Sequence, residues 1–452
     1  MQDENLMLDQ ETAGKAAYEF FYRNDPNERD FLGPIVTIDD PILDRPMRTR
    51  TAKVGTVRGA KPENMHDHIV YLDPVPHIRL DSPKPLQGWY SSKGDSDKPN
   101  QRDRPCMTDA VLTQPYGGWC SVGCHSFCYV LNGHYGYRGA GLVTVPVNYG
   151  QYVRRQLAAM TIGQAGYFSS FTDPFMPIED WYHNTREGAT AFVEAGLPIF
   201  FLSRRAYPDW AFDLLARNPL SYMQKSLNTP HEDDWKQLSP GASTLAEHFD
   251  QIREARARGI YVSIQINPVI PGVADHSDIE HLFELLAEAG ANHCIVKFVE
   301  SNHASTKAMV QRLTERFGDN RMAIFKELMV EHQAGNQTTI SEQYRREGHT
   351  RYRAKATALG MTYSLCYEYT KRDGRWRSMG PEFLTSEQCH GHRVPWHTKT
   401  NGHFTPMEVC PPSGCLSCGD ETGTGKCGSP LLSAASALKL SDFKKPLDVA
   451  AI

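Results

Sequence analysis

Short apolar runs alternate with longer amphipathic segments between residues 110 and 370. The runs PIFFLS at 198–203 and HCIVKFV at 293–299 are apolar almost throughout, which is typical of strands buried on both faces of a parallel sheet. On this pattern we predict strands at residues 109–115, 164–170, 198–203, 221–228, 260–267, 293–299 and 361–368.

The segments between these runs repeat apolar residues at helical spacing, which indicates helices. Several of them end at a glycine, the residue that most readily adopts the left-handed conformation after a helix. These glycines are Gly196, Gly259, Gly290 and Gly360. We predict helices at residues 149–160, 179–195, 206–218, 245–258, 277–289 and about 340–358.

Repeated strand–helix units of about 30 residues imply an α/β fold with a parallel sheet. Since no fingerprint of an open dinucleotide-binding sheet is present, we predict a partial (β/α)6-type barrel at residues 106–370. Chemistry in such a barrel lies at the carboxyl ends of the strands. Residues 1–105, which contain many Pro, Asp and Arg, are expected to be an irregular N-terminal extension. Residues 371–452 are expected to form a small Cys-rich metal-binding region.

The composition is that of an ordinary soluble protein, with 40% hydrophobic and 22% charged residues among 452 and a net charge of −5. No apolar run reaches the roughly 18 residues of a membrane-spanning helix. The first residues lack the basic and apolar regions of a signal peptide. We therefore expect a cytoplasmic protein with no membrane partner, in which the eleven cysteines serve as metal ligands or buried thiols rather than in disulfides.

Three cysteines lie in one short loop, WCSVGCHSFCYV, directly after the first predicted strand: Cys120, Cys124 and Cys128. Three thiolates leave one iron of a [4Fe–4S] cluster without a protein ligand, and an open metal position can bind a cofactor or substrate. The alternative is a closed zinc site with His125 or His134 as its fourth ligand. The position of the loop at the carboxyl end of a barrel strand favours the open cluster.

Four further cysteines crowd the C-terminal segment CPPSGCLSCGDETGTGKC, with four, two and eight residues between them: Cys410, Cys415, Cys418 and Cys427. Gly and Pro between the cysteines permit tight turns, and four thiolates complete a tetrahedral site. We predict a metal site here, which holds either a second [4Fe–4S] cluster or a structural Zn.

Basic residues are concentrated in three segments. Residues 45–61 contain four Arg and two Lys without an acidic residue, and residues 344–355 and 371–378 interleave basic with aromatic side chains. Such segments suit a phosphate backbone and unstacked bases. Solvated helix faces and loops are the alternative explanation.

Four stretches together resemble the radical S-adenosylmethionine (SAM) superfamily, in the branch of spore photoproduct lyase and DNA-repair-photolyase-like proteins. They are the cysteine loop, YFSSFTDPFMPIE at 167–179, LSPGAST at 238–244 and SIQINPVIPGVAD at 263–275. The resemblance covers residues 110–370. It implies that the open iron binds SAM, whose reductive cleavage produces a 5′-deoxyadenosyl radical, while the protein orients the reactants and excludes water.

The resemblance also implies which residues bind SAM. Arg204 stands where relatives place a basic residue against the SAM carboxylate, a role that suits a guanidinium group. Phe127 and Tyr129 flank the last cysteine of the loop, and Asn267 is expected to shape the adenosine pocket. Further contacts to SAM are expected from residues at strand ends: Ser169, Ser170, Asp173, Ser226 and Asn228. Capping of a helix is an alternative role for Asp173.

Two departures from the family pattern indicate a divergent member. Three residues separate Cys124 from Cys128, where the family usually has two. The hydrogen-donating cysteine that spore photoproduct lyase carries just before the motif SSFTDP is also missing. Cys366 and Glu368, on the last predicted strand, are expected to face the same cavity. Cys366 is the candidate catalytic hydrogen donor, and a buried inert thiol is the alternative.

The chain is therefore expected to be a radical SAM enzyme that abstracts hydrogen from a large substrate, a nucleobase or modified base in DNA. The outcome is a rearrangement, a lyase cleavage or another modification. One alternative is a radical SAM maturase of a peptide. An alternative of another class is a non-catalytic, zinc-stapled protein that binds nucleic acid. A reducing partner such as flavodoxin or ferredoxin is implied by the enzyme hypotheses.

Overall fold

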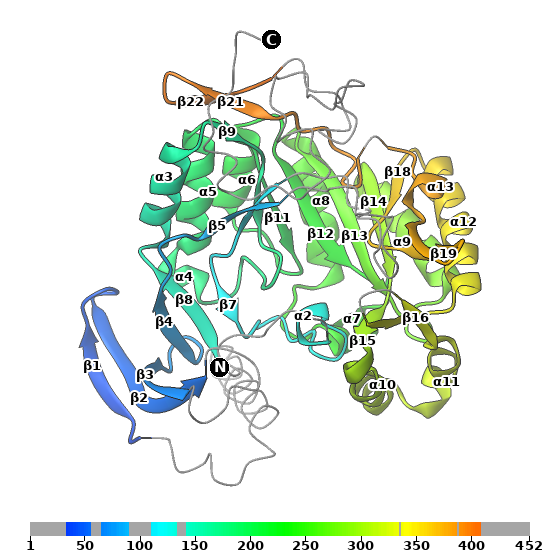
Figure 1. Cartoon of the computed structure of the whole chain (residues 1–452), viewed down its shortest axis with the longest axis horizontal. Coiled ribbons are helices and arrows are strands. Elements are labelled where there is room, and N and C mark those ends of the chain that lie inside the picture. Colours follow the sequence, from blue (N-terminus) through cyan, green and yellow to red (C-terminus); the bar gives the residue numbers. More distant parts are fainter. Residues whose placement is uncertain are drawn as a thin grey trace.

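The computed structural model describes residues 33–55, 65–89, 110–132, 142–333, 336–386 and 388–407. Its central feature is an eight-stranded sheet in the order β18-β14-β13-β12-β11-β10-β6-β5 (Figure 1). Apart from the antiparallel β5 (Leu86–Trp89), the strands are parallel. They are β6 (Ala110–Thr113), β10 (Gly166–Phe168), β11 (Ile199–Ser203), β12 (Tyr222–Leu227), β13 (Tyr261–Val269), β14 (His293–Phe298) and β18 (Thr362–Leu365).

The parallel strands follow one another across the sheet in chain order, which confirms the predicted α/β arrangement of a partial barrel. The sheet has free edges at β18 and β5, so the described residues form no closed barrel. The predicted helices are also present, with the second one divided in two. They are α3 (Tyr149–Ala159), α4 (Glu179–Tyr182), α5 (Asn184–Glu194), α6 (Asp209–Ala216), α8 (Leu245–Ala257), α9 (His276–Ala289) and α12 (Glu342–Ala358).

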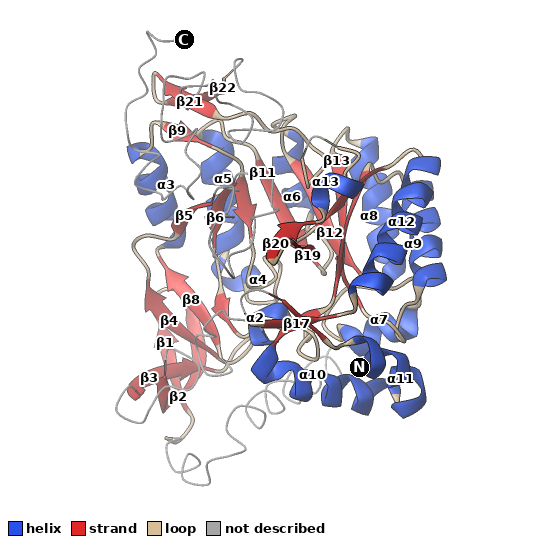
Figure 2. Cartoon of the chain, turned by 45° about the vertical axis from the view of Figure 1, so that its right-hand side comes forward, coloured by secondary structure: helices blue, strands red, loops and turns tan. Residues whose placement is uncertain are grey.

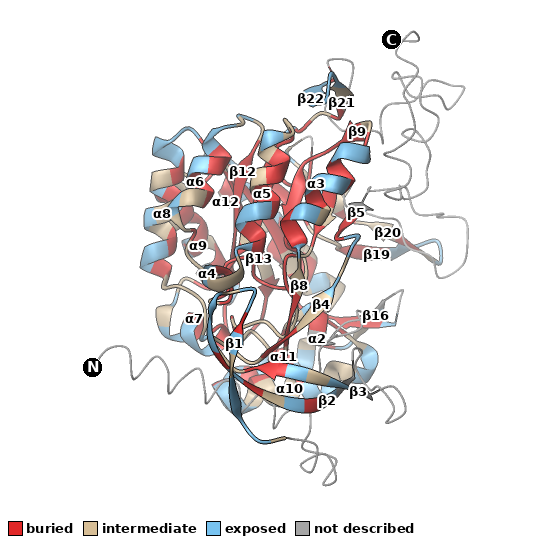
Figure 3. Ribbon diagram, turned by 90° about the vertical axis from the view of Figure 1, so that its left-hand side faces the viewer, coloured by how far each residue is buried: buried red, intermediate tan, exposed pale blue. Residues whose placement is uncertain are grey.

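Side chains of the strands alternate between a helix-facing side and an inner side. Cys294, Val296 and Phe298 of β14 belong to the main hydrophobic core, which the helices cover. On the inner side, Phe200 and Tyr222 stack in a smaller aromatic core. Figure 3 shows the resulting pattern, with buried strands and exposed outer faces of the helices.

The amino ends of the strands are covered by a segment that follows the barrel. His390 pairs with the Tyr222 hydroxyl at 2.6 Å, and His293 with the carbonyl oxygen of Cys389 at 2.8 Å. Beyond this segment, β21 (His397–Thr400) and β22 (His403–Pro406) form a small sheet with β9 (Ile162–Gly163). The site must therefore open at the opposite end, where the strands have their carboxyl ends.

Residues 36–55 and 65–81 contain four strands, which corrects the expectation of an irregular N-terminal extension there. A second sheet has the order β1-β2-β3-β4-β8-β7. Buried Asp40 and Arg79 form an ion pair at 2.6 Å, and Arg79 lies over the Tyr71 ring, so polar side chains help to hold this sheet together. Its strands are β1 (Val36–Asp40), β2 (Arg45–Gly55), β3 (Met65–Tyr71), β4 (His77–Asp81), β8 (Val143–Val147) and β7 (Gly117–Gly118).

An insertion between β14 and α12 was not predicted. It forms a small sheet with two helices, and both β15 and α10 contact α2 (Tyr129–Asn132), the helix that follows the cysteine loop. Figure 2 shows β17 and α10 beside α2 at the carboxyl ends of the barrel strands. The insertion consists of β15 (Glu300–Asn302), α10 (His303–Phe317), α11 (Asp319–Leu328), β16 (Glu331–Gln333) and β17 (Gln337–Thr339).

Four further elements complete the described chain. Helix α7 (Glu232–Leu238) precedes the loop at 238–244. After β18, the chain forms a hairpin of β19 (Tyr369–Arg372) and β20 (Arg375–Ser378), followed by the short helix α13 (Gly380–Phe383). Among the described residues, no helix combines the length and apolar character needed to span a membrane.

Candidate active site

The three cysteines of the loop lie between β7 and α2, on the carboxyl side of β6, as the sequence predicted. Tight backbone hydrogen bonds wind the loop, including one of 2.9 Å from the Cys128 N–H to the Cys124 carbonyl oxygen. A hydrogen bond from Cys128 lowers the pKa of the Cys124 thiol to about 7, against the opposing effect of burial. Burial and the neighbouring charges of Cys124 and Asp173 raise the pKa of Cys120 to about 12. The three sulfurs therefore share one small region.

The loop at 238–244 supports the cysteine loop by close backbone packing. The Gly241 N–H donates a 2.9 Å hydrogen bond to the Val122 carbonyl oxygen. A Cβ on Gly241 would lie 2.0 Å from the Ser121 carbonyl oxygen, so only glycine permits this approach. The Arg205 Nη1 donates to the Gly241 carbonyl oxygen at 2.7 Å from the other side. The motif LSPGAST thus has a physical function, which is to position the cysteine loop.

Arg204 lies directly after β11 and is buried beside the cysteines. Burial lowers the pKa of its guanidinium group, while the charges of the three cysteines and Asp173 act in the opposite direction. Its guanidinium lies 5.2 Å from the Phe127 ring centroid and 5.3 Å from that of Trp235. The structure therefore places a cation, an aromatic ring and three thiols together, as the sequence analysis expected.

The Arg204 guanidinium also connects the ends of the next two strands. Its Nη2 donates to the Asn267 carbonyl oxygen at 2.7 Å, and its Nη1 lies 3.4 Å from both Asn228 Oδ1 and Ser239 Oγ. Asn228 Nδ2 is buried, and no partner for it is found among the described residues. Because a buried amide without a partner is costly, this group is suited to donate to a bound ligand.

Asp173 organises the site through the backbone. Its carboxylate accepts hydrogen bonds from the Arg204 N–H at 2.8 Å and from Ser203 Oγ at 2.9 Å. It also accepts one of 2.9 Å from the Phe175 N–H, and its own N–H donates to Cys120 Sγ at 3.4 Å. Asp173 thus ties the third strand to the cysteine loop.

The other expected SAM contacts are less concentrated. Tyr129 donates through its hydroxyl to the Ser170 carbonyl oxygen, and Ser169 Oγ donates to the Thr172 carbonyl oxygen. Ser170 Oγ is buried without a partner among the described residues. Ser226 is buried on the inner side of β12, two residues before Asn228.

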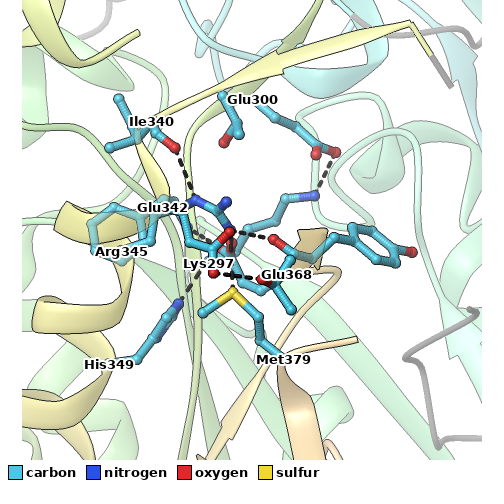
Figure 4. Close-up of polar contacts among 12 residues, drawn as sticks. Lys297, Glu300, Ile340, Glu342, Arg345, His349, Glu368 and Met379 are labelled. Atoms are coloured by element: carbon cyan, nitrogen blue, oxygen red, sulfur yellow. Dashed lines mark hydrogen bonds and ion pairs between the residues drawn. The ribbon is translucent and has the colours of Figure 1, made fainter. Parts of the chain in front are cut away.

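Cys366 and Glu368, which were expected to face one cavity, have different environments. Burial raises the pKa of the Cys366 thiol to about 12, although Lys297 lowers it, so the thiol is protonated. Glu368 is tied into the helix-facing side: its carboxylate accepts from the Phe298 N–H at 2.6 Å and from Arg345 at 2.7 Å (Figure 4). The expectation that Glu368 points into the cavity is therefore wrong.

Sequence reasoning missed Trp235 and Ser239, which complete the surroundings of Arg204. The motif LSPGAST contains Ser239, so a signal was available, whereas Trp235 lies on α7, which was not predicted. The predicted C-terminal ligands Cys410, Cys415, Cys418 and Cys427 lie outside the described residues. Within the described part of the chain, no group of three or more His, Cys, Asp or Glu side chains is arranged to hold a single metal ion.

The residues present fit a [4Fe–4S] cluster with a bound amino acid ligand. Each cysteine of such a cluster binds a different iron, so the sulfurs surround a cluster rather than one ion. Arg204 supplies a buried positive charge for a carboxylate, and Asn228 supplies an Nδ2 group that has no partner among the described residues.

A comparison with known proteins identifies the family of the chain. The chain is 54% identical over 458 aligned residues to a protein of Pseudomonas phage M6 named radical SAM Nα-GlyT isomerase, which covers 98% of this chain and 95% of the relative. No family model matches the chain.

Solved structures with a similar fold include a mutant spore photoproduct lyase with dinucleoside spore photoproduct. It is 17% identical, covers 60% of this chain and 78% of the lyase, and has a TM-score of 0.44. Coproporphyrinogen III oxidase from Escherichia coli is 11% identical, covers 61% of this chain and 65% of the oxidase, and has a TM-score of 0.28.

Three clustered cysteines at the carboxyl side of a parallel sheet are typical of an iron–sulfur enzyme. The 54% identity to the phage protein shows that the chain belongs to the radical SAM enzymes. Its activity is of the isomerase type. The family uses a [4Fe–4S] cluster, SAM and a reductant, which decides against zinc in the cysteine loop and against the alternative of a non-catalytic zinc protein.

Proposed function

We propose that this enzyme isomerises a glycine that is attached through its α-nitrogen to a thymine base of DNA, so that the attachment moves from nitrogen to the α-carbon. The observation that carries the proposal is the 54% identity, over nearly the whole chain, to an isomerase named for Nα-GlyT. The name of the relative specifies Nα as the atom through which glycine is attached. This detail is informative if the isomerase changes the atom of attachment.

The proposed reaction balances without an outside oxidant. The bond between nitrogen and the methylene carbon of the base breaks, and a bond between that methylene and the glycine α-carbon forms. One hydrogen leaves the α-carbon and one hydrogen is added to nitrogen, so substrate and product have the same mass. When bound, the cluster and SAM supply a 5′-deoxyadenosyl radical able to remove the α-hydrogen.

We assign a separate role to each residue of the site. Cys120, Cys124 and Cys128 would hold three irons, and Arg204 would bind the SAM carboxylate. Asn228 would donate its free amide hydrogen to SAM, while the buried inner face of the barrel excludes water. A low-potential flavodoxin or ferredoxin is the proposed reductant.

A basic hairpin supports DNA as the carrier of the base. Strands β19 and β20 follow the last barrel strand and carry four basic residues beside the buried Trp376: Lys371, Arg372, Arg375 and Arg377. Basic side chains suit the phosphates of a nucleic-acid backbone.

The basic residues of α12 give less support. Arg346 pairs with Glu342 and Glu382, and Arg351 pairs with Glu280, so much of their charge is neutralised within the protein. Arg372 of the hairpin also pairs with Glu382, so part of the hairpin's charge is likewise neutralised within the protein.

A second candidate substrate is a peptide. In the name of the relative, the T of GlyT can also denote threonine, and glycine is an amino acid. The proposals are separated by giving the reconstituted enzyme, with SAM and dithionite, either an oligonucleotide with Nα-glycyl thymine or a glycine–threonine peptide. We expect an isobaric product with a new primary amine from the oligonucleotide alone. Conversion of the peptide alone would replace the DNA proposal with the peptide one.

A further inference from the structure

The last residues of β14 place a lysine on the inner side of the barrel. His293, on the inner side, reaches Ser364 and the segment at the amino ends of the strands, whereas Phe298 packs against helix residues. Because side chains alternate along a strand, Lys297 shares the inner side with His293 and Ile295. It therefore stands at the carboxyl end of β14, where barrel enzymes place their chemistry.

Lys297 forms a nearly buried ion pair with Glu300. The distance from Lys297 Nζ to Glu300 Oε1 is 2.5 Å, and the two side chains are 12% and 17% exposed. Lys297 also lies 5.4 Å from the ring centroid of Tyr367. Burial acts to lower the pKa of Lys297, but the charge of Glu300 outweighs it and raises this pKa, so the ammonium group is charged at neutral pH.

This pair has spare hydrogen-bonding capacity. An ammonium group carries three donors, and Glu300 is the one hydrogen-bond acceptor that Lys297 contacts among the described residues. The neighbouring Arg345, by contrast, donates to Glu368 and to the carbonyl oxygens of Ile340 and Tyr369. Figure 4 shows the two pairs side by side. Arg345 is fully buried and held by these three acceptors, and its Nη2 lies 3.5 Å from Glu331 Oε1, so it is committed to the fold. Lys297 and Glu300, in contrast, retain donors and acceptors for a ligand.

The position of the pair connects it with the proposed active site. Cys366, directly after β18, lies close enough to Lys297 for the two groups to influence each other's pKa. On the other side β13 ends near Asn267, whose carbonyl oxygen binds Arg204. Glu300 begins β15, the strand that contacts α2 behind the cysteine loop. Lys297 and Glu300 thus lie on the same rim of the barrel as Arg204, several strands further along.

We propose that Lys297 and Glu300 form the binding site for the amino acid part of the substrate, with Lys297 holding its carboxylate and Glu300 its amine. This inference rests on the proposed function, since glycine supplies both groups. A lysine and a glutamate 2.5 Å apart match the opposite charges of an amino acid zwitterion. The carboxylate is unchanged by the isomerisation, so Lys297 can bind it throughout the reaction. Glu300 would bind the nitrogen both as the secondary amine of the substrate and as the primary amine of the product.

The test measures binding, so that it does not depend on turnover. Two labelled oligonucleotides are compared by fluorescence anisotropy with the reconstituted enzyme and SAM, without reductant. One carries Nα-glycyl thymine and the other carries the N-methyl analogue, which lacks the carboxylate. We expect the wild type to prefer the carboxylate by about 10- to 100-fold, the range of a charge-assisted hydrogen bond. Lys297→Met should bind both equally, and Lys297→Arg should retain the preference.

Lys326→Met is the matched control. Lys326 pairs with Asp319 on α11 of the same insertion, but this pair is exposed, so the variant should keep the full preference. A thermal melt and SAM binding establish that each variant is folded. An undiminished preference in Lys297→Met would overturn the proposal.

A second probe pair separates the subsite from the substrate assignment. N-benzylglycine and N-benzylmethylamine carry the same amine with and without the carboxylate but no nucleobase. If neither oligonucleotide binds the wild type, a Lys297-dependent preference for N-benzylglycine supports the subsite and removes the thymine assignment. If neither pair shows a Lys297-dependent preference, the subsite proposal is wrong.

Discussion

The substitution Gly241→Ala should destroy the cluster without unfolding the protein. The added Cβ would lie 2.0 Å from the Ser121 carbonyl oxygen and 3.1 Å from the Val122 Cα, whereas ordinary contact begins at 3.4 Å. The oxygen is about 1.4 Å too close, and no rotamer change relieves a clash between two backbones. Overpacking of this kind costs about 1–3 kcal/mol, which a chain of this size tolerates. The cheaper response is for the cysteine loop to move.

A movement of that size is far larger than a metal site accepts, since ligand distances tolerate only about 0.2 Å. The assay is the iron and sulfide bound per chain after anaerobic reconstitution, together with the visible absorbance of the cluster. We expect Gly241→Ala to lose most of its iron while its unfolding transition remains cooperative. Gly380→Ala is the control, because its nearest contact is the flexible Ser378 Oγ at 3.1 Å. Full iron content in Gly241→Ala would refute the role assigned to the 238–244 loop.

Three other outcomes follow from the contacts. Arg204→Lys should weaken SAM binding by about 10- to 100-fold in equilibrium dialysis, because an ammonium cannot replace the forked guanidinium; unchanged affinity would remove Arg204 from the SAM site. Burial alone would raise the pKa of Glu368, but Arg345 and His349 lower it to about 2. The ionised carboxylate therefore stabilises the fold above the ordinary pKa of 4.5. This stabilisation is lost as the pH falls from 4.5 towards 2. Urea unfolding of Glu368→Gln should therefore show a deficit of about 3 kcal/mol at pH 7 that shrinks at pH 3, and a deficit that does not change with pH would contradict this account. Cys366→Ser should leave isomerisation nearly intact, since an isomerase returns its own hydrogen; abolished turnover in a folded, cluster-loaded variant would instead support the predicted donor role.

The barrel was predictable because its strands are continuous apolar runs and its helices end at glycine. The N-terminal sheet was not, since β4 pairs with β8, more than sixty residues later, and its stability depends partly on the Arg79–Asp40 pair. Local hydrophobic periodicity does not predict a strand pairing or an ion pair between residues so far apart in the sequence. The insertion was missed because it interrupts the strand–helix repeat between β14 and α12, and the prediction relied on that repeat.

The candidate site shows the same division. The cysteines, Arg204 and Asn228 follow strands in the sequence, so their convergence could be expected from the parallel sheet. Lys297 lies inside the apolar run HCIVKFV and was counted only as part of a strand. Its role emerges from its side of the strand and from Glu300, which belongs to the unpredicted insertion.

The most direct test of the account uses an oligonucleotide whose Nα-glycyl thymine carries deuterium on the glycine α-carbon. The reconstituted enzyme is given SAM and dithionite, and the nucleosides and SAM fragments are analysed by mass spectrometry. The account predicts deuterium in 5′-deoxyadenosine or SAM, together with a rearranged nucleoside that carries a primary amine. Formation of 5′-deoxyadenosine without deuterium, or a product whose elemental composition differs from that of the substrate, would contradict it.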